Sequence, residues 1–375
     1  RPDSEIEETV SSKRGEASPS SPPLNPGERS VFKILVVGLL LVLLIGGVSG
    51  GLFLNEKINL LSSTVIDGPS PESSVSIDRR GNTETIIYDF GDQQDISLKE
   101  PYSSDGIYFW SEHIFISRTE DASGVHLVAN GATGDMVYNP AAIARYGLNQ
   151  YSNYLKLQDP VYMDDARVQA DYLVDALDPE TGVLLNEFDS TINTGSAYEI
   201  LRAPWVSADA QGLTCSLLAR MYDQTGDEKY SEACKLAIQP FLRTVEDGGV
   251  TREFQGYTFF ESYPTKLPDF ELSGFMNSLI GLFDVWQITQ DETAYSLYTQ
   301  GVETLEFSLP YFDSAGISNY QLAHLFRSSG TIYIPGTAFH IDHIQRLEAI
   351  NQYEESPVLA HYIKLWTMYI KGNAG

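Results

Sequence analysis

The stretch Phe259-Phe260-Glu261-Ser262-Tyr263-Pro264-Thr265 decides the fold, together with Gly274-Phe275-Met276-Asn277-Ser278-Leu279-Ile280-Gly281-Leu282 shortly after it. Two further segments complete the pattern near the C-terminus, Glu355-Ser356-Pro357 and Tyr369-Ile370-Lys371-Gly372. The apolar residues around these segments recur with a helical period, and the same period holds from about Tyr138 onward.

Eight segments with this period are predicted to be helices. They are Pro140–Leu155, Asp164–Leu177, Ser207–Tyr222, Glu228–Arg243, Ser273–Gln287, Asp291–Ser308, His340–Asn351 and Pro357–Ile370. Gly- and Pro-containing breaks separate them, such as Gly248-Gly249 and Leu309-Pro310. Consecutive helix pairs with little strand between them predict a mainly α fold, an α/α toroid or incomplete α/α barrel over residues 136–375. Loops at one rim of such a toroid carry the chemistry.

The first part of the chain differs from this helical body. Residues 1–30 are rich in Ser, Pro and Glu and are predicted to be a disordered tail. Residues 31–55 contain Ile34–Leu54, which holds no charge and has the length of a transmembrane helix. A signal peptide is the alternative, but the long polar tail favours an uncleaved anchor. Positive charges before the run predict a single-pass protein with a cytoplasmic N-terminus and an extracytoplasmic body.

A stalk and a small antiparallel β region are predicted between the anchor and the helices. Residues 56–75 contain Ser and Pro and form the stalk, and residues 76–135 hold the β region. Short apolar runs at 86–88, 107–110, 113–116 and 125–128 are separated by Gly, Asp and Ser, a pattern typical of β-hairpins.

Composition limits the partners and the chemistry. Asp and Glu total 51 against 24 Lys and Arg, a formal charge of −27, which argues against binding to nucleic acid. An acidic partner would require a local basic cleft or a salty medium that screens repulsion. A disulfide between Cys215 and Cys234 is conceivable, but two buried thiols are favoured, and no metal site follows from them.

The ordered segments resemble the C-terminal domain of the D-glucuronyl C5-epimerase family. Besides those quoted above, Tyr138-Asn139-Pro140, Tyr146-Gly147-Leu148, Trp205-Val206-Ser207-Ala208 and Gln211-Gly212 match it in order. The resemblance implies a toroidal domain that inverts C5 of glucuronate residues within a polysaccharide, giving iduronate. It implies a uronic-acid-containing polysaccharide as partner and leaves a homodimer open. The reaction itself needs no redox cofactor, and no metal site is predicted from the residues.

The family's three proton-transfer tyrosines fall on Tyr263, Tyr320 and Phe339. The third position has therefore lost its phenol, and His340 or Tyr333 is the first candidate to replace it. A family glutamate falls on Ser262, with Glu261 one residue earlier, and a family arginine falls on Ala323 beside His324.

Inversion at C5 requires acid and base groups on both faces of the sugar, with donors or cations that hold the carboxylate. We therefore predict a catalytic set of Tyr263, Tyr320, His340 and Glu261. The predicted substrate-binding set comprises Trp205, Gln211, Asn277, His324, Tyr333, Arg327 and Arg346, with Arg202 and Lys266 as further candidate carboxylate holders. Since the chain has 22 tyrosines, only the family positions raise Tyr263 and Tyr320 above a packing role.

Several alternatives stay open at this level. A uronate polysaccharide lyase starts with the same proton abstraction, and a hydrolase would need paired carboxyl groups such as Glu261 with Asp269 or Glu271. Phe339 favours a non-catalytic glycan-binding protein. His340 and His343 are interpreted as satisfied core histidines rather than metal ligands. Two helix starts are also predicted: Ser356 caps the last helix before Pro357, and Asp164-Asp165 caps the second.

Overall fold

A computed structural model describes residues 74–80, 83–89, 96–109, 119–195, 197–327, 332–333 and 336–371. The chain divides into two compact units, residues 1–68 and 69–375, and the described residues belong to the second. The predicted tail and anchor lie outside the described residues, so both stay predictions. No helix within the described ranges has both the length and the apolar character that crossing a membrane requires.

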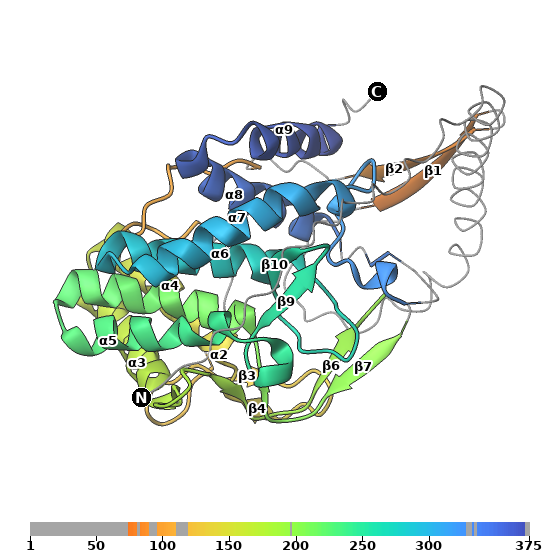
Figure 1. Cartoon of the computed structure of the whole chain (residues 1–375). Coiled ribbons are helices and arrows are strands. Elements are labelled where there is room, and N and C mark those ends of the chain that lie inside the picture. Colours follow the sequence, from red (N-terminus) through yellow and green to blue (C-terminus); the bar gives the residue numbers. More distant parts are fainter. Residues whose placement is uncertain are drawn as a thin grey trace, which may run out of the picture. The chain divides into compact units, whose positions relative to one another are not determined.

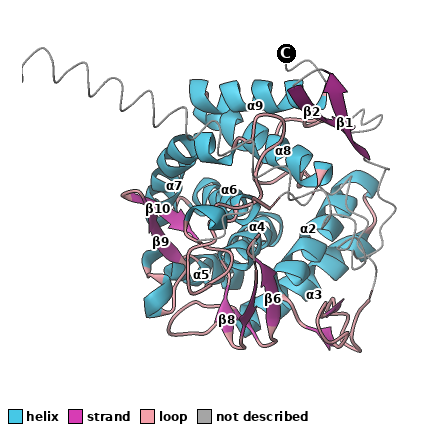
Figure 2. Cartoon of the chain, turned by 90° about the vertical axis from the view of Figure 1, so that its right-hand side faces the viewer, coloured by secondary structure: helices cyan, strands magenta, loops and turns pink. Residues whose placement is uncertain are grey.

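Eight α-helices frame the described part of the second unit, in four consecutive pairs (Figure 1). They are α2 (Pro140–Leu157), α3 (Pro160–Ala176), α4 (Ala208–Thr225), α5 (Glu228–Ala237), α6 (Leu272–Thr289), α7 (Glu292–Phe312), α8 (Thr337–Glu354) and α9 (Pro357–Ile370). Helices pack within each pair, and α2, α4, α6 and α8 also contact one another in that order. Figure 2 shows α4 and α6 near the middle, with α3, α7 and α9 further out. The mainly helical prediction is confirmed, and the paired arrangement fits the predicted toroid.

Helix starts follow local cap chemistry. Ser356 Oγ accepts hydrogen bonds from the N–H groups of Val358 and Leu359, and Pro357 is the first residue of α9, as predicted. The prediction that Asp164-Asp165 caps the second helix is wrong. Helix α3 begins four residues earlier, because Asp159 caps it and the fixed φ of Pro160 suits a first helical position.

The predicted break at Leu309-Pro310 is also wrong. Helix α7 continues through Pro310 to Phe312. Proline in the last turn removes only one intrahelical hydrogen bond. Leu309 and Phe312 are fully buried on either side of it, so packing holds the turn in helical form.

Helices α4 and α6 form the closest packed pair of the core. A Cβ on Gly281 would overlap the carbonyl of Gly212, and a Cβ on Gly212 would overlap the backbone at Ser278. These glycines let the two backbones meet. Cys215 on α4 and Cys234 on α5 are buried free thiols, as the sequence favoured.

Within the described residues, the strands form five two-stranded antiparallel sheets. They are β1 (Ser74–Arg80) with β2 (Thr83–Asp89), β3 (Val128–Ala129) with β4 (Met136–Val137), β5 (Leu185–Asn186) with β8 (Trp205–Val206), β6 (Ser190–Asn193) with β7 (Tyr198–Leu201), and β9 (Thr251–Phe254) with β10 (Tyr257–Phe260). The sheet β1–β2 and strand β3 overlap the predicted β region 76–135, and β4 lies just beyond it. The other three sheets interrupt the helices and were not predicted.

The run at 107–109 is not a strand. Tyr108 is fully buried, and its N–H bonds the side chain of Ser152. Nearby, Arg220 on α4 bonds the carbonyls of Ser103 and Gly106, which a neighbouring strand would otherwise take up. Arg220 also pairs with Asp284 at 2.7 Å, and both side chains are fully buried. This segment is therefore held against the helices by an internal ion pair.

Candidate active site

Two tyrosine hydroxyls meet between loops that are far apart in the sequence. Tyr263 follows β10, and Tyr320 follows α7 by eight residues. Their hydroxyl oxygens lie 3.4 Å apart, and both side chains are half-buried. The structure thus brings together the two residues predicted as the acid and base pair.

The loop that carries Tyr263 is organised by Glu261. The carbonyl of Glu261 accepts a hydrogen bond from Ala208, and its buried carboxyl accepts from the N–H groups of Asp269 (3.2 Å) and Phe270 (3.0 Å). Burial raises the pKa of Glu261 to about 7, while Arg252, at 3.7 Å, opposes the rise. The carboxyl thus contacts the backbone of its own loop and Arg252 on β9, so we assign it a structural role in place of the predicted catalytic one.

Backbone pairing and aromatic packing hold Tyr320. Its carbonyl accepts from Leu272 at the start of α6, and its N–H bonds the carbonyl of Tyr333. The rings of Tyr333 and Phe339 stand nearly perpendicular to the Tyr320 ring, with centroids 5.6 Å and 5.2 Å away. All three family positions therefore converge, although Phe339 contributes a ring without a hydroxyl.

The surroundings keep both phenols protonated. Burial is the main cause that raises the pKa of Tyr263 and Tyr320, and the negative charges of Glu271 and Asp209 raise both further. The contact between the hydroxyls lowers the pKa of Tyr263 and raises that of Tyr320. Tyr320 is therefore the better proton donor to its partner, and Tyr263 is the phenol that more readily becomes a phenolate.

Glu271 joins the tyrosine loop to helix α6. Its carboxylate caps α6 by accepting from Ser273 and Gly274, each at 2.7 Å, and it also accepts from Ser262 Oγ at 2.8 Å. A Cβ on Gly274 would overlap Ser262 Oγ and crowd Asp209, so only glycine fits there. Glu271 therefore fixes the loop start that precedes Tyr263.

Asp209, near the start of α4, is an acidic neighbour that the sequence reasoning missed. It accepts from Asn277 Nδ2 at 2.8 Å and pairs with Arg145 at 3.5 Å. Asp209 lies between Ala208 and Gln211, inside the segment 205–212 that resembles the family, and this position could have identified it as a candidate site residue. Asn277 also accepts from Arg346 Nε at 2.8 Å. Asn277 and Arg346 are almost fully buried, so this chain of contacts supports Asp209 from inside the core.

His340 does not replace the missing third phenol. Its Nδ1 accepts from the Ser318 N–H at 3.0 Å, and its Nε2 lies 3.1 Å from the Trp366 carbonyl. Burial lowers its pKa to about 4. His343 is also buried, between Ser318 Oγ and Ser273 Oγ. The interpretation as satisfied core histidines holds, and the catalytic prediction for His340 is wrong because both ring nitrogens face the interior.

Gln211 and Trp205 also have structural contacts. Gln211 is fully buried, bonds the carbonyls of Gly182 and Ala237 and accepts from Leu184, so its predicted contact with substrate is wrong. Trp205 is nine-tenths buried, and its Nε1 bonds the carbonyl of Phe188. Its ring packs 6.3 Å from that of Tyr263.

A shallow groove adjoins this aromatic packing. It has a volume of about 450 Å³ and is lined by Glu199, Ile200, Leu201, Arg202, Pro204, Trp205, Val206, Val245, Gly248, Gly249, Pro264 and Lys266. Arg202 pairs with Asp189 and is mostly exposed. Pro264, the residue after Tyr263, lines this groove, whereas Tyr263 and Tyr320 themselves do not.

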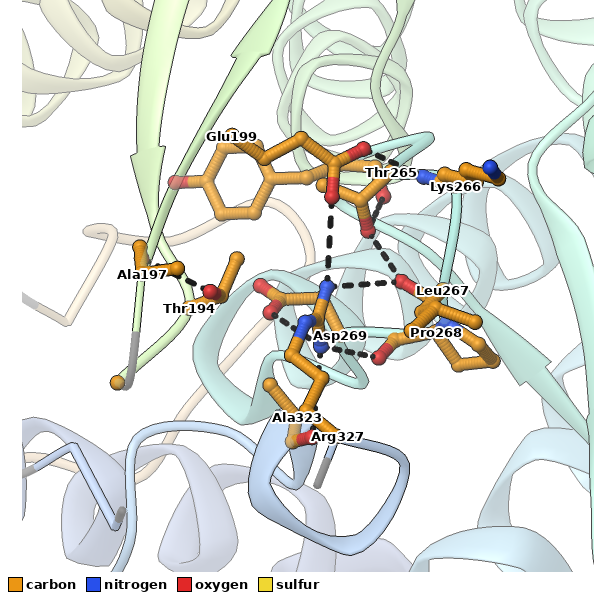
Figure 3. Close-up of polar contacts among 12 residues, drawn as sticks. Thr194, Ala197, Glu199, Thr265, Lys266, Leu267, Pro268, Asp269, Ala323 and Arg327 are labelled. Carbon is orange, nitrogen blue, oxygen red and sulfur yellow. Dashed lines mark hydrogen bonds and ion pairs between the residues drawn. The ribbon is translucent and has the colours of Figure 1, made fainter. Parts of the chain in front are cut away.

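Arg327 connects Glu199, which lines the groove, with the loop Leu267–Asp269 (Figure 3). It bonds the carbonyls of Pro268 (2.9 Å) and Leu267 (3.1 Å), and it lies 3.6 Å from Glu199 and 4.0 Å from Asp269. His324 lies half-buried in the short 3-10 turn η5 (Ala323–Leu325), and burial lowers its pKa. No described group of three or more His, Cys, Asp or Glu side chains could hold a metal ion.

Comparison with known proteins gives the site a family context. Residues 182–368 match the family described as D-glucuronyl C5-epimerase C-terminus. The chain is 36% identical over 188 residues to the D-glucuronyl C5-epimerase of Caenorhabditis elegans, a match that covers 46% of this chain and 30% of that protein. An uncharacterized protein of Methanocaldococcus jannaschii is 25% identical over 233 residues, covering 58% of this chain and 72% of that protein.

Among solved structures, the unsaturated glucuronyl hydrolase of Bacillus sp. GL1 aligns with a TM-score of 0.40 and 13% identity. The alignment covers 62% of each chain.

Proposed function

Through residues 182–368 this chain belongs to the D-glucuronyl C5-epimerase family, and we propose that it inverts C5 of D-glucuronate residues within a polysaccharide. The observation that carries the proposal is the contact between the Tyr263 and Tyr320 hydroxyls at 3.4 Å, from loops 57 residues apart. These two phenols are the proton-transfer groups.

The proposed reaction balances with these two groups alone. The reaction starts from the minor form of the pair, in which Tyr263 has lost its proton to solvent. This phenolate removes the C5 proton, which leaves an enolate of the uronate. Tyr320 then donates its proton to the opposite face of C5, giving L-iduronate and a Tyr320 phenolate. After release, the proton on Tyr263 passes back to Tyr320 across the hydroxyl contact. The pair is thereby reset for another turnover.

The closed contact has a geometric consequence for substrate entry. Each oxygen must approach C5 to about 3–3.5 Å, so opposed phenols must stand roughly 6–7 Å apart when the sugar lies between them. The observed 3.4 Å leaves no room for the ring. We propose that binding separates the two loops by roughly 3 Å. Without substrate, the two phenols therefore form a closed resting pair.

A uronate lyase is the second candidate, and the same short distance favours it. If the hydroxyls stay in contact during the reaction, both phenols face one side of the sugar. One could then remove the C5 proton while the other protonates the departing C4 oxygen. The product would be an unsaturated uronate rather than an inverted one.

The test uses the full chain with a glucuronate polymer in deuterated water. NMR should show deuterium entering C5 and iduronate signals growing. The experiment is run at low and at high salt, because the chain carries a charge of −27 and salt screens its repulsion of an acidic polymer. Unsaturated products that absorb in the ultraviolet would instead identify a lyase, and the absence of both would contradict both candidates. We also propose the membrane anchor at residues 31–55, which would place the body outside the cytoplasm beside such polymers.

A further inference from the structure

The carboxylate of Glu199 occupies a site that is built to hold a carboxylate. One oxygen accepts from the Lys266 N–H at 2.6 Å, and the other lies 3.6 Å from the Arg327 guanidinium. A backbone donor and a guanidinium are the groups that bind carboxylates in proteins. Figure 3 shows Glu199 facing both of them.

Glu199 lies between this site and the groove. It lines the groove together with Lys266, whereas Arg327 is not among the lining residues. The side chain of Glu199 is 29% exposed, and that of Arg327 is 10% exposed. Glu199 therefore covers the arginine from the side on which a polymer would lie.

Glu199 lies on β7, one strand of the short two-stranded hairpin β6–β7. Strands β6 and β7 pair only with each other, through four residues each. The described outer side chains of β7, Tyr198 and Ile200, are 62% and 52% exposed. The inner side chains of the hairpin, Ile192 and Leu201, pack with Trp205. The Glu199 side chain itself is held by a backbone hydrogen bond and a partly exposed ion pair, so it can leave Arg327 at a small cost.

The other carboxyl beside Arg327 does not neutralise it fully near neutral pH. Asp269 lies 4.0 Å away, and burial, together with the charge of Glu261, raises its pKa to about 8. Glu199 is the second carboxyl on this guanidinium, at 3.6 Å. When Glu199 leaves, the guanidinium attracts another anion.

We propose that Arg327 and the Lys266 N–H form a subsite for a uronate carboxylate of the polymer, next to the reacting residue, and that Glu199 occupies it in the resting chain. This subsite rests on the proposed function for its substrate class. The incoming carboxylate displaces Glu199 and releases the β6–β7 hairpin from the two tyrosine loops. Those loops are held together by Arg327, which bonds Leu267 and Pro268 after Tyr263 and Ala323 after Tyr320.

The test compares Glu199→Gln with wild type in calorimetric binding of glucuronate oligosaccharides at low salt. Glutamine keeps the acceptor for the Lys266 N–H and loses the charge. A partly exposed ion pair contributes little, so affinity should rise only about two- to fivefold. The same oligosaccharide with its carboxyl groups reduced to alcohols should show no gain. Glu232→Gln, an exposed charge removal on α5, is the matched control and should leave both affinities unchanged.

Arg327→Lys supplies the opposite change. It keeps the charge but loses the planar fork, so it should weaken binding of the acidic oligosaccharide and leave the reduced one unaffected. Unchanged or weaker binding of the acidic oligosaccharide by Glu199→Gln would overturn the subsite. A gain that also appears with the reduced oligosaccharide would overturn it as well.

Measurement of C5 exchange on the same samples separates the two proposals. If the chain exchanges the C5 hydrogen but Glu199→Gln shows no gain in affinity, the subsite is contradicted and the epimerase proposal stands. If Glu199→Gln gains affinity but no C5 exchange is observed, the epimerase proposal is contradicted and the subsite stands as a site that binds uronate.

Discussion

Removal of either phenol should separate catalysis from stability. Tyr263→Phe and Tyr320→Phe delete one hydroxyl each and keep the ring packing around Trp205 and Phe339. The deleted contact is 3.4 Å long, beyond the usual range for O–H···O bonds, and half-buried. Its loss should therefore cost less than about 1 kcal/mol of unfolding free energy. A general acid or base contributes about 10²- to 10⁴-fold, so the exchange rate at C5 should fall by that factor.

The assay pairs NMR exchange rates with urea denaturation of the same variants. Tyr230→Phe is the matched control, because its hydroxyl bonds Asp171 at 2.6 Å on the outer helices, away from the tyrosine pair. This control should lose about 1 kcal/mol of stability and keep its exchange rate. The reasoning is refuted if either active-site variant retains more than about a tenth of the wild-type rate.

Three further outcomes are expected. Arg220→Met leaves the Asp284 carboxylate buried without its cation and should cost about 3–5 kcal/mol, measured by urea denaturation. Asp269→Asn should gain stability relative to wild type as pH rises from about 4 to about 8, measured by thermal unfolding. The folded pKa of Asp269, about 8, lies above that of an unfolded chain, so the wild type is stabilised while this carboxyl is protonated and loses that contribution as it ionises. Phe339→Tyr should change the exchange rate less than about threefold, since the pair already supplies both protons.

Each of these outcomes can fail. A loss below about 1 kcal/mol in Arg220→Met would mean that water reaches Asp284. A pH-independent difference between Asp269→Asn and wild type would show that the carboxyl is ionised throughout. A rate gain of about a hundredfold in Phe339→Tyr would mean that the family's third phenol, and not the Tyr263 and Tyr320 pair, limits the reaction.

Much of the helical frame follows from sequence pattern. Apolar periodicity located each α-helix of the described region but not the short 3-10 turns. Ser356-Pro357 marked a start correctly because both capping and the fixed φ of proline act locally. The end of α7 was missed at Pro310, since burial of Phe312 overrides the local preference. Hairpin β6–β7 was missed because strands of four residues carry little local signal and gain stability mainly from contacts elsewhere in the chain.

The candidate site was predictable only in part, because burial and contacts between distant residues are not visible in the sequence. The family positions brought Tyr263 and Tyr320 together correctly. Residue type alone does not reveal burial, so Gln211 and His340 looked like ligands although both satisfy interior groups. Glu199 carried no sequence signal, because its role depends on a contact with Arg327, which lies 128 residues further along the chain.

The most direct test of the account is the distance between the two phenol oxygens in a crystal of the chain with a bound glucuronate oligosaccharide. The account predicts C5 between them, with the oxygens opened from 3.4 Å to roughly 6–7 Å on opposite faces of the ring. Oxygens that remain in contact on one face of the sugar would contradict it.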